Sequence, residues 1–174
     1  MSSFKIGVIS DTHKRGDLQK EAISQLKSKG AEYLLHLGDF ELVENLENLA
    51  TSGLPYAGVF GNNDYALKGL EYKYKIESEP YFLKIKDTTI KMMHLPYYLT
   101  NDSDIVLFGH LHKFSAEYKG GSLFLNPGEI CAREKDLSEC AIIEVSKSHF
   151  LVDYIYREPT ALKWSSREFE FKRD

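Results

Sequence analysis

The first third of the chain alternates between short apolar runs and amphipathic segments. Residues 4–10 are apolar and rich in β-branched side chains, a pattern that predicts a buried strand. After it, apolar side chains recur on one helical face, and we expect a helix that Asp17 caps and Gly30 ends. The pattern then predicts a strand at 33–37, a helix at 42–50 and a strand at 56–60. This alternation indicates a parallel sheet built by right-handed crossovers.

Strands dominate the pattern in the rest of the chain. They are expected at 81–86, 89–94, 104–108, 113–118, 122–125, 141–146 and 149–156. Turn-forming residues at 86–87, 119–121 and 147–148 suit hairpins. The tail, 157–174, alternates aromatic and charged residues near its end, which fits either an added edge strand or a contact with another subunit. The pattern over residues 1–174 therefore predicts two packed sheets with helices outside them, in a single domain whose core spans about 4–156.

Composition places the chain among ordinary globular proteins. Its 174 residues are 43% hydrophobic and 28% charged, and the formal net charge is -4. This acidic balance argues against a broad nucleic-acid-binding surface, so stable binding to DNA or RNA is not expected. Cys131 and Cys140 are too few for a disulfide scaffold, and we expect buried free thiols. The sequence shows no signal-peptide pattern and no apolar run of roughly 20 residues, so a cytoplasmic protein without a membrane partner is expected.

Side chains capable of chemistry gather directly after predicted strands. Four short motifs share this position: Asp11-Thr12-His13, Gly38-Asp39, Gly61-Asn62-Asn63-Asp64 and Gly109-His110-Leu111-His112. His94 stands alone at the end of the strand predicted at 89–94. Ligands of open α/β sheets bind beyond the carboxyl ends of the strands, so we expect these side chains to converge.

The residue types in these motifs are those of a metal site. In Asp-x-His and His-x-His, residues two apart in an extended segment point the same way. Imidazole and carboxylate are the usual ligands of zinc, manganese and iron, and an asparagine carbonyl adds a neutral oxygen. Taken singly, Gly-Asp and Gly-Asn are ordinary turn chemistry, and a lone histidine at a strand end is usually structural. The ordered set, each member after a strand, predicts metal binding.

Together, the motifs resemble the five ordered motifs of calcineurin-like metallophosphoesterases, over about residues 4–156. The small segment 65–80 and the sequence Asn126-Pro127-Gly128-Glu129 are similar to the YfcE-like phosphodiesterase branch. The resemblance implies an α/β (α+β) fold, a four-layer α-β-β-α sandwich of two mixed sheets with two metals at one end. It also implies a phosphodiesterase that hydrolyses small phosphate esters, with a metal-bridging hydroxide as nucleophile.

The same resemblance assigns the ligands of two divalent cations. The expected sets are Asp11, His13 and His112 for one ion and Asn62, His94 and His110 for the other, with Asp39 bridging both. Asp39, Asn62 and His94 would also take part in catalysis. Manganese is the first expectation, with nickel, zinc or iron as alternatives, because availability as well as geometry decides which metal is bound.

Two positions depart from the family pattern. Many members have a histidine after the ligand asparagine, where it aids departure of the leaving group. This chain has Asn63 there, which cannot act as a general acid near neutral pH. The common His-Gly-His segment is here His94-Leu95-Pro96, so a contact on the substrate side is missing. Without the acid, we expect aryl phosphodiesters to be hydrolysed faster than alkyl phosphomonoesters.

Three further residues are expected around the site. Asn63 and Arg133 are expected to contact the substrate, and a surface salt bridge is the alternative for Arg133. Asp64 is expected either to hold a ligand or a neighbouring loop by hydrogen bonds or to be an ordinary turn aspartate.

Two other functions stay open beside a small-molecule phosphodiesterase. A retromer subunit shares the implied fold and works as a protein-binding scaffold, although this chain keeps all seven ligand types. A metal-dependent nuclease is the second alternative, which the net acidity disfavours. A homo-oligomer is expected from the family habit and from the aromatic tail.

Overall fold

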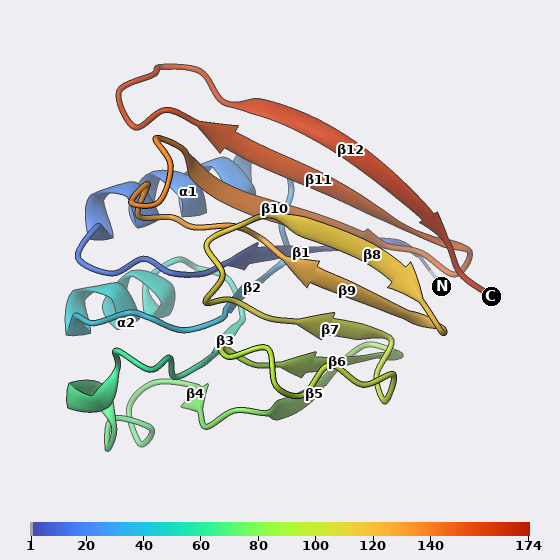
Figure 1. Ribbon diagram of the computed structural model, residues 1–174, viewed down its shortest axis with the longest axis horizontal. Coiled ribbons are helices and arrows are strands. Elements are labelled where there is room, and N and C mark those ends of the chain that lie inside the picture. The colour runs from blue at the N-terminus through green and yellow to red at the C-terminus, as the bar shows by residue number, and fades with distance from the viewer. Residues whose placement is uncertain (1) are drawn as a thin grey trace.

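The computed structural model describes residues 2–174 (Figure 1). Its elements are β1 (Phe4–Ile9), α1 (Gly16–Ser28), β2 (Tyr33–His36), α2 (Val43–Ala50), β3 (Tyr56–Val59), the 3-10 helix η1 (Tyr65–Leu67), β4 (Ile76–Glu77), β5 (Tyr81–Ile85), β6 (Thr88–Met92), β7 (Ile105–Leu107), β8 (Ser115–Lys119), β9 (Ser122–Asn126), β10 (Ser138–Val145), β11 (His149–Arg157) and β12 (Ser165–Lys172). Among these residues, none of the helices has the length and apolar character needed to cross a bilayer.

Two mixed sheets lie face to face. The larger sheet has the order β12-β11-β10-β1-β2-β3-β4, with β1 to β4 parallel and β10 to β12 antiparallel. The smaller sheet has the order β5-β6-β7-β9-β8, in which β6, β7 and β9 are parallel. The expected α/β class with two mixed sheets is therefore confirmed.

The main core lies between the two sheets. Ile6 and Val8 of β1 pack there with Ile90 and Met92 of β6, and all four side chains are fully buried. A second apolar cluster joins the other face of the larger sheet to α1 and α2, for example through Leu26. Strand β1 is thus buried on both faces, which explains why its sequence is an almost continuous apolar run.

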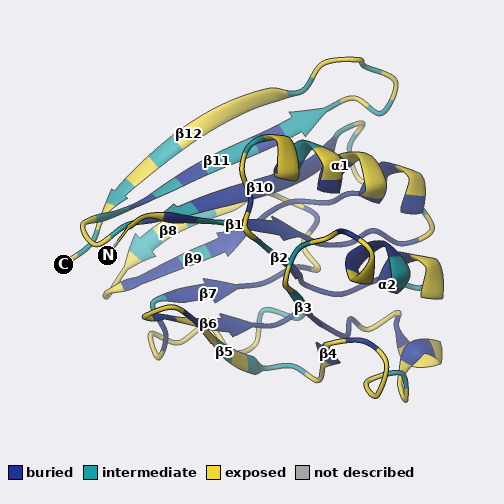
Figure 2. Cartoon of the chain, turned by 180° about the vertical axis from the view of Figure 1, so that it is seen from behind, coloured by how far each residue is buried: buried dark blue, intermediate teal, exposed yellow. Residues whose placement is uncertain are grey.

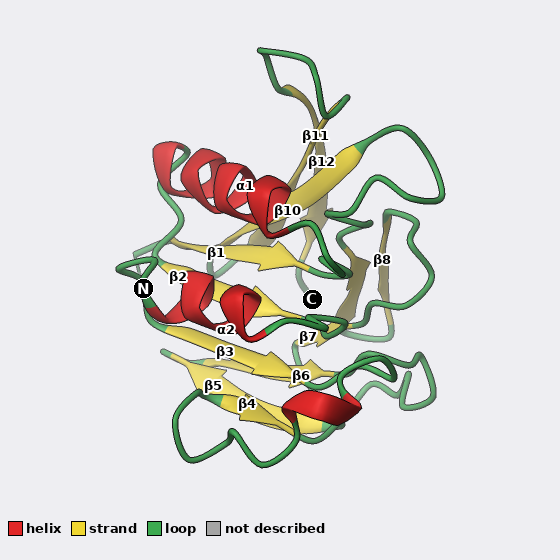
Figure 3. Cartoon of the chain, turned by 90° about the vertical axis from the view of Figure 1, so that its left-hand side faces the viewer, coloured by secondary structure: helices red, strands yellow, loops and turns green. Residues whose placement is uncertain are grey.

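The helical layers differ from the expected four-layer sandwich. Both α-helices of residues 2–174 cover the same face of the larger sheet, and no helix covers the outer face of the smaller one (Figure 3). The connection from β6 to β7 is a loop that contains Pro96, and Met93, Val106 and Phe108 form a small cluster on this side of the sheet. The described chain has three layers.

Local elements show where the sequence pattern was informative and where it was not. The tail forms β12, which pairs antiparallel with β11, so the edge-strand alternative is confirmed. Figure 2 shows β12 largely exposed at the border of the sheet. The expected cap at Asp17 was wrong, because α1 begins at Gly16 after Arg15, and Asp17 lies in the first turn paired with Arg15. Cys131 and Cys140 are free and buried, as expected.

Candidate metal centre

The side chains singled out in the sequence converge at one end of the two sheets. Asp11 follows β1, Asp39 follows β2, Asn62 follows β3, His94 follows β6, and His110 and His112 follow β7. These five strands run parallel within their sheets, so their carboxyl ends share one edge. Backbone hydrogen bonds from Asp11 N to Gly38 O (3.0 Å) and from His13 N to Asp39 O (2.9 Å) join the first two loops.

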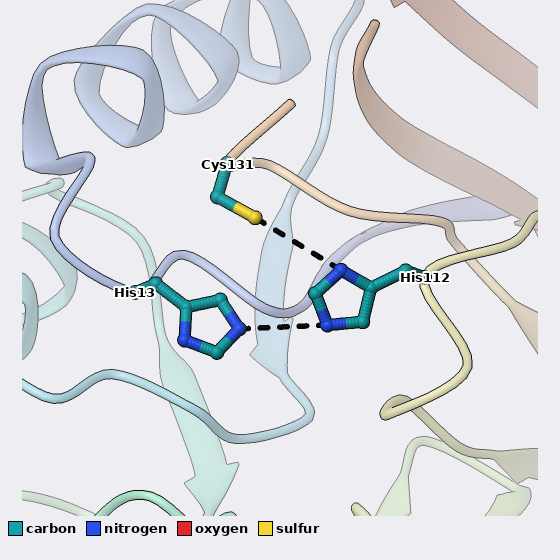
Figure 4. A group of neighbouring side chains, drawn as sticks. All are labelled: His13, His112 and Cys131. Carbon is teal, nitrogen blue, oxygen red and sulfur yellow. Dashed lines mark hydrogen bonds between the residues drawn. The ribbon is translucent and has the colours of Figure 1, made fainter. Parts of the chain in front are cut away.

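Three side chains form the first group. Asp11 Oδ1 lies 3.1 Å from His112 Nε2 and 3.9 Å from His13 Nε2. The Nε2 atoms of the two histidines are 3.4 Å apart, and the stacked rings have centroids separated by 5.3 Å. Figure 4 shows these two nitrogens directed at each other. The three ligand-type atoms therefore surround one point.

Asp39 connects this group with a second one. Its Oδ2 atom lies 3.6 Å from His13 Nε2 and 3.4 Å from His94 Nε2. His94 Nε2 in turn lies 2.8 Å from Asn62 Oδ1, and the His110 ring packs edge-on against the His94 ring with centroids 5.1 Å apart. One carboxylate oxygen thus approaches both groups.

The distances and the protonation pattern both fit divalent cations. Nitrogen and oxygen atoms bind such ions at about 2.0–2.2 Å, so atoms that share an ion lie about 3.0–3.6 Å apart. Separations of 3.1, 3.4 and 3.6 Å between aspartate oxygens and histidine nitrogens match this range. His94 Nδ1 donates to the Leu37 carbonyl (2.8 Å) and His112 Nδ1 donates to Glu129. A neutral ring at either position would turn its Nε2 lone pair toward a carboxylate, which is unfavourable unless a cation or proton lies between them.

The electrostatics of the site point the same way. Burial alone would lower the pKa of His112, but hydrogen bonds, first of all to Asp11, raise that pKa to about 11. Burial would raise the pKa of Asp39, yet hydrogen bonding to His94 and the charge of that ring hold it below its usual range. A site that retains protons so firmly has excess negative charge, which a metal cation can neutralise in place of the proton. The described residues therefore fit a metal site.

Backbone strain is concentrated at these positions. Five of the seven expected ligands have a positive φ: Asp11 (54°), His13 (49°), Asp39 (60°), His110 (67°) and His112 (54°). Residues other than glycine seldom adopt this left-handed conformation, and each instance costs on the order of 1–3 kcal/mol. The loops are therefore shaped to direct these side chains, at the expense of local stability.

Asp64 ties the second and third motifs together. Its Oδ2 atom accepts hydrogen bonds from the backbone N–H groups of Asp39 (2.9 Å) and Gly61 (2.7 Å), and its Oδ1 accepts one from Glu41 (2.8 Å). Burial raises the pKa of Asp64, while these three donors favour its charged form. The carboxylate thus holds the loop that presents Asp39, which is the hydrogen-bonding alternative rather than that of an ordinary turn aspartate.

The two expected substrate contacts lie at the mouth of the site. A cleft of about 520 Å³ opens there, and both Asn63 and Arg133 line it. Asn63 also hydrogen-bonds to Asp39. Arg133 Nη2 lies 3.4 Å from His112 Nε2, while its Nε lies 3.6 Å from Glu134. Arg133 therefore reaches the cleft and also makes the surface ion pair that was its alternative.

Three residues that were not expected at the site lie against it: Glu129, Cys131 and Glu79. Cys131 Sγ lies 3.3 Å from Glu129 Oε2 and 4.0 Å from His112 Nδ1, on the side of the ring away from His13 (Figure 4). Glu79 Oε2 accepts hydrogen bonds from the backbone N–H groups of His94 (2.5 Å) and Leu95 (2.8 Å). The position of Glu129, shortly after strand β9, was a usable signal because the ligand motifs also follow strands. Glu79 carried no such signal.

Two stacked mixed sheets with a histidine- and aspartate-rich site at the carboxyl ends of their strands define an α/β sandwich with a metal-type centre. The chain belongs to the calcineurin-like phosphoesterase superfamily, whose domain model matches residues 4–148.

The descriptions of similar proteins fit this family assignment. A phosphodiesterase of Methanocaldococcus jannaschii is 24% identical over 163 residues, which are 84% of this chain and 96% of the relative. The crystal structure of a predicted phosphoesterase from Streptococcus pneumoniae has a TM-score of 0.70 at 27% identity, covering 98% of this chain and 99% of that one. Vacuolar protein sorting 29 from Cryptosporidium parvum has a TM-score of 0.79 at 20% identity, covering 98% and 99%. This last likeness shows the fold alone.

Proposed function

We propose that this chain is a metal-dependent phosphodiesterase whose site holds two divalent cations. The observation that carries the proposal is the position of Asp39, whose Oδ2 atom lies 3.6 Å from His13 Nε2 and 3.4 Å from His94 Nε2. A carboxylate oxygen between the imidazoles of two ligand groups is suited to bridge two ions and to offset their charge. The family and the phosphodiesterase relative support the same reaction class.

The ligand sets follow the two groups of side chains. One ion would be held by Asp11, His13 and His112, the other by Asn62, His94 and His110, with Asp39 shared between them. When bound, two divalent cations lower the pKa of a water between them and neutralise charge on the phosphoryl oxygens. Manganese is our first candidate, and nickel, zinc and iron are alternatives with the same ligand chemistry.

The remaining residues of the cleft orient the ester. Arg133 and Lys113 line the cleft and can donate to phosphate oxygens, Arg133 in bidentate fashion. Asn63 donates a hydrogen bond to Asp39, and its amide is not acidic enough to protonate a leaving group. Esters whose leaving groups depart without protonation should therefore react fastest, which favours aryl phosphodiesters over alkyl phosphomonoesters.

Metal reconstitution tests the proposal. Protein stripped of metal is reloaded with Mn²⁺, Ni²⁺ or Zn²⁺ and assayed on aryl phosphodiesters, cyclic nucleotides, alkyl monoesters, DNA and RNA. Activity on the small diesters should return with metal and be lost in Asp39→Asn. Asp136→Asn, which removes an exposed carboxylate, is the matched control and should retain activity. Preferential hydrolysis of DNA or RNA would support the nuclease instead.

A protein-binding scaffold is the second candidate function. The loop after His94 exposes three consecutive apolar side chains, Tyr97 (75%), Tyr98 (43%) and Leu99 (43%). Such a patch beside a site is typical of a surface that meets another protein. A protein that binds both cations and still hydrolyses no ester would support the scaffold. Light scattering on the same sample tests the expected homo-oligomer.

A further inference from the structure

Glu129 lies entirely inside the protein, with an exposed fraction of 0%, directly behind His112. A carboxylate in such a place is unfavourable unless several donors stabilise it. Both oxygens of Glu129 accept hydrogen bonds, and the donors indicate what this side chain does.

The Oε2 atom of Glu129 holds the imidazole of His112. It accepts the hydrogen bond of His112 Nδ1 and also that of the Cys131 thiol, at 3.3 Å. An imidazole that donates from Nδ1 presents Nε2 on its opposite side, and His112 Nε2 lies 3.1 Å from Asp11 Oδ1. The carboxylate thereby selects the ring orientation and tautomer in which Nε2 can bind a cation.

The second oxygen of this carboxylate holds the loop that follows it. Oε1 accepts hydrogen bonds from the backbone N–H groups of Glu134 (2.9 Å) and Lys135 (3.1 Å). Lys135 Nζ lies 3.7 Å from the same oxygen and 2.5 Å from Glu139 Oε1. Arg133, which lines the cleft, comes directly before these two anchored residues in the chain. One carboxylate therefore contacts both the ring of His112 and the loop next to Arg133.

We propose that Glu129 is a positioning residue, which sets His112 for metal binding and holds the loop that brings Arg133 to the cleft. This inference rests on the proposed function, because it takes His112 as a metal ligand. Glutamine has the size of glutamate but must turn an amide NH₂ to one of the two sides. Toward His112, that NH₂ would donate to Nδ1 and leave the ring proton on Nε2, where it opposes a cation. Toward the loop, it would face two backbone N–H donors.

Calorimetric titration of the metal-stripped protein with Zn²⁺ tests this role without relying on activity. Wild type should bind two Zn²⁺ ions, and Glu129→Gln should weaken one of the two affinities by about 10–100-fold. The matched control is Glu139→Gln, which changes an equally buried carboxylate that bonds to the Glu129 N–H (3.1 Å) and to Lys135 but is hydrogen-bonded to none of the expected ligands. It should leave both affinities at the wild-type values. If Glu129→Gln does not fold, Glu129→Asp, which shortens the reach toward His112, should weaken the same affinity.

A double-mutant cycle separates action through His112 from a general structural effect. In a His112→Asn background, Glu129→Gln should cause no further loss of Zn²⁺ affinity, because the ring that it positions is gone. Far-ultraviolet circular dichroism verifies that each variant is folded.

The outcomes distinguish this inference from the proposed function. Wild-type protein that binds no Zn²⁺ overturns both. Two bound ions in wild type, with unchanged affinities in Glu129→Gln, overturn this inference alone. Equal losses in Glu129→Gln and Glu139→Gln, or additive losses in the cycle, overturn it as well, because the effect would then not pass through His112.

Discussion

Asn63 donates two hydrogen bonds to Asp39, one to each carboxylate oxygen. Its backbone N–H lies 3.0 Å from Oδ1 and its amide Nδ2 lies 2.8 Å from Oδ2. Oδ2 is also the oxygen that approaches the imidazoles of His13 and His94. The residue that follows the expected ligand Asn62 therefore orients the shared carboxylate.

If the proposed function holds, replacing Asn63 with histidine should change which leaving groups are tolerated. Asn63→His supplies a titratable donor at the mouth of the cleft, and general acids contribute about 10²–10⁴-fold to rate. We expect the ratio of alkyl to aryl phosphodiester turnover to rise at least about tenfold, even if loss of the amide contact to Asp39 lowers both rates. The measurement is kcat over a series of leaving groups with matched metal loading. Asn63→Ala should keep the wild-type ratio, and an unchanged ratio in the histidine variant would contradict the account.

Arg133 should contribute mainly to substrate binding. Its side chain is 55% exposed and lines the cleft, and its surface partner Glu134 is more than half exposed too, so the ion pair itself adds little stability. Arg133→Ala should raise KM for phosphodiesters about tenfold, the effect of losing one charge-assisted hydrogen bond. Arg133→Lys keeps the charge but loses the bidentate geometry, so its KM should lie between those of wild type and Arg133→Ala. Steady-state kinetics that leave KM unchanged in Arg133→Ala would reject this role.

The strands that place the site were predictable because their apolar runs are local and continuous. Strand β1 was clear for this reason, whereas β4 has two residues and pairs only with the end of β3, which is too little for a pattern. The convergence of the motifs was predictable because each one follows a parallel strand. The absence of an outer helix layer was not predictable in this way, since that layer was implied by the resemblance alone and the β6–β7 connection is an irregular loop.

Other features of the site depend on contacts between residues far apart in the sequence. His110 N donates to Asp11 Oδ2 at 3.0 Å, across 99 positions, and the bond between His112 and Glu129 spans 17. The position of Glu129 after β9 places it near the site, but its bond to His112 cannot be read from the sequence. Likewise, nothing local predicts a positive φ at three histidines, because the surrounding loops impose it.

Gly38 should tolerate no side chain. Its φ is +97°, and a Cβ atom there would lie 2.7 Å from Gly61 N and 2.8 Å from His94 Nδ1. Gly38→Ala should therefore lower the free energy of unfolding by at least about 2 kcal/mol, from backbone strain plus the forced shift of its neighbours. The matched control is Gly69→Ala, at φ +98° with nothing within 4 Å of the added Cβ, which reports the backbone term alone. Urea unfolding measures both, and equal losses would contradict the predicted close approach.

His36 should make the metal-free protein sensitive to mild acid. Complete burial lowers its pKa to about 3, against 6.5 for an ordinary histidine, and its ring bridges Thr12 and the Gly38 N–H in the neutral form. The unfolded chain then binds one more proton below pH 6.5, so stability is full above that value and falls as the pH drops toward 3. Between pH 7 and 5, wild type should lose about 2 kcal/mol more than His36→Asn.

Urea unfolding of metal-stripped wild type and His36→Asn at pH 5, 6 and 7 measures this difference in stability directly. The other titrating groups are common to both proteins, so their contributions cancel. Parallel stability curves for wild type and His36→Asn would show that the ring is not held neutral by burial.

Anomalous diffraction from crystals grown with Mn²⁺ tests the central claim most directly, because it locates the ions without reference to activity. Two anomalous peaks are expected, both in contact with Asp39, one beside Asp11, His13 and His112 and the other beside Asn62, His94 and His110. Peaks absent from this cleft at saturating Mn²⁺, or a single peak that Asp39 does not touch, would contradict it.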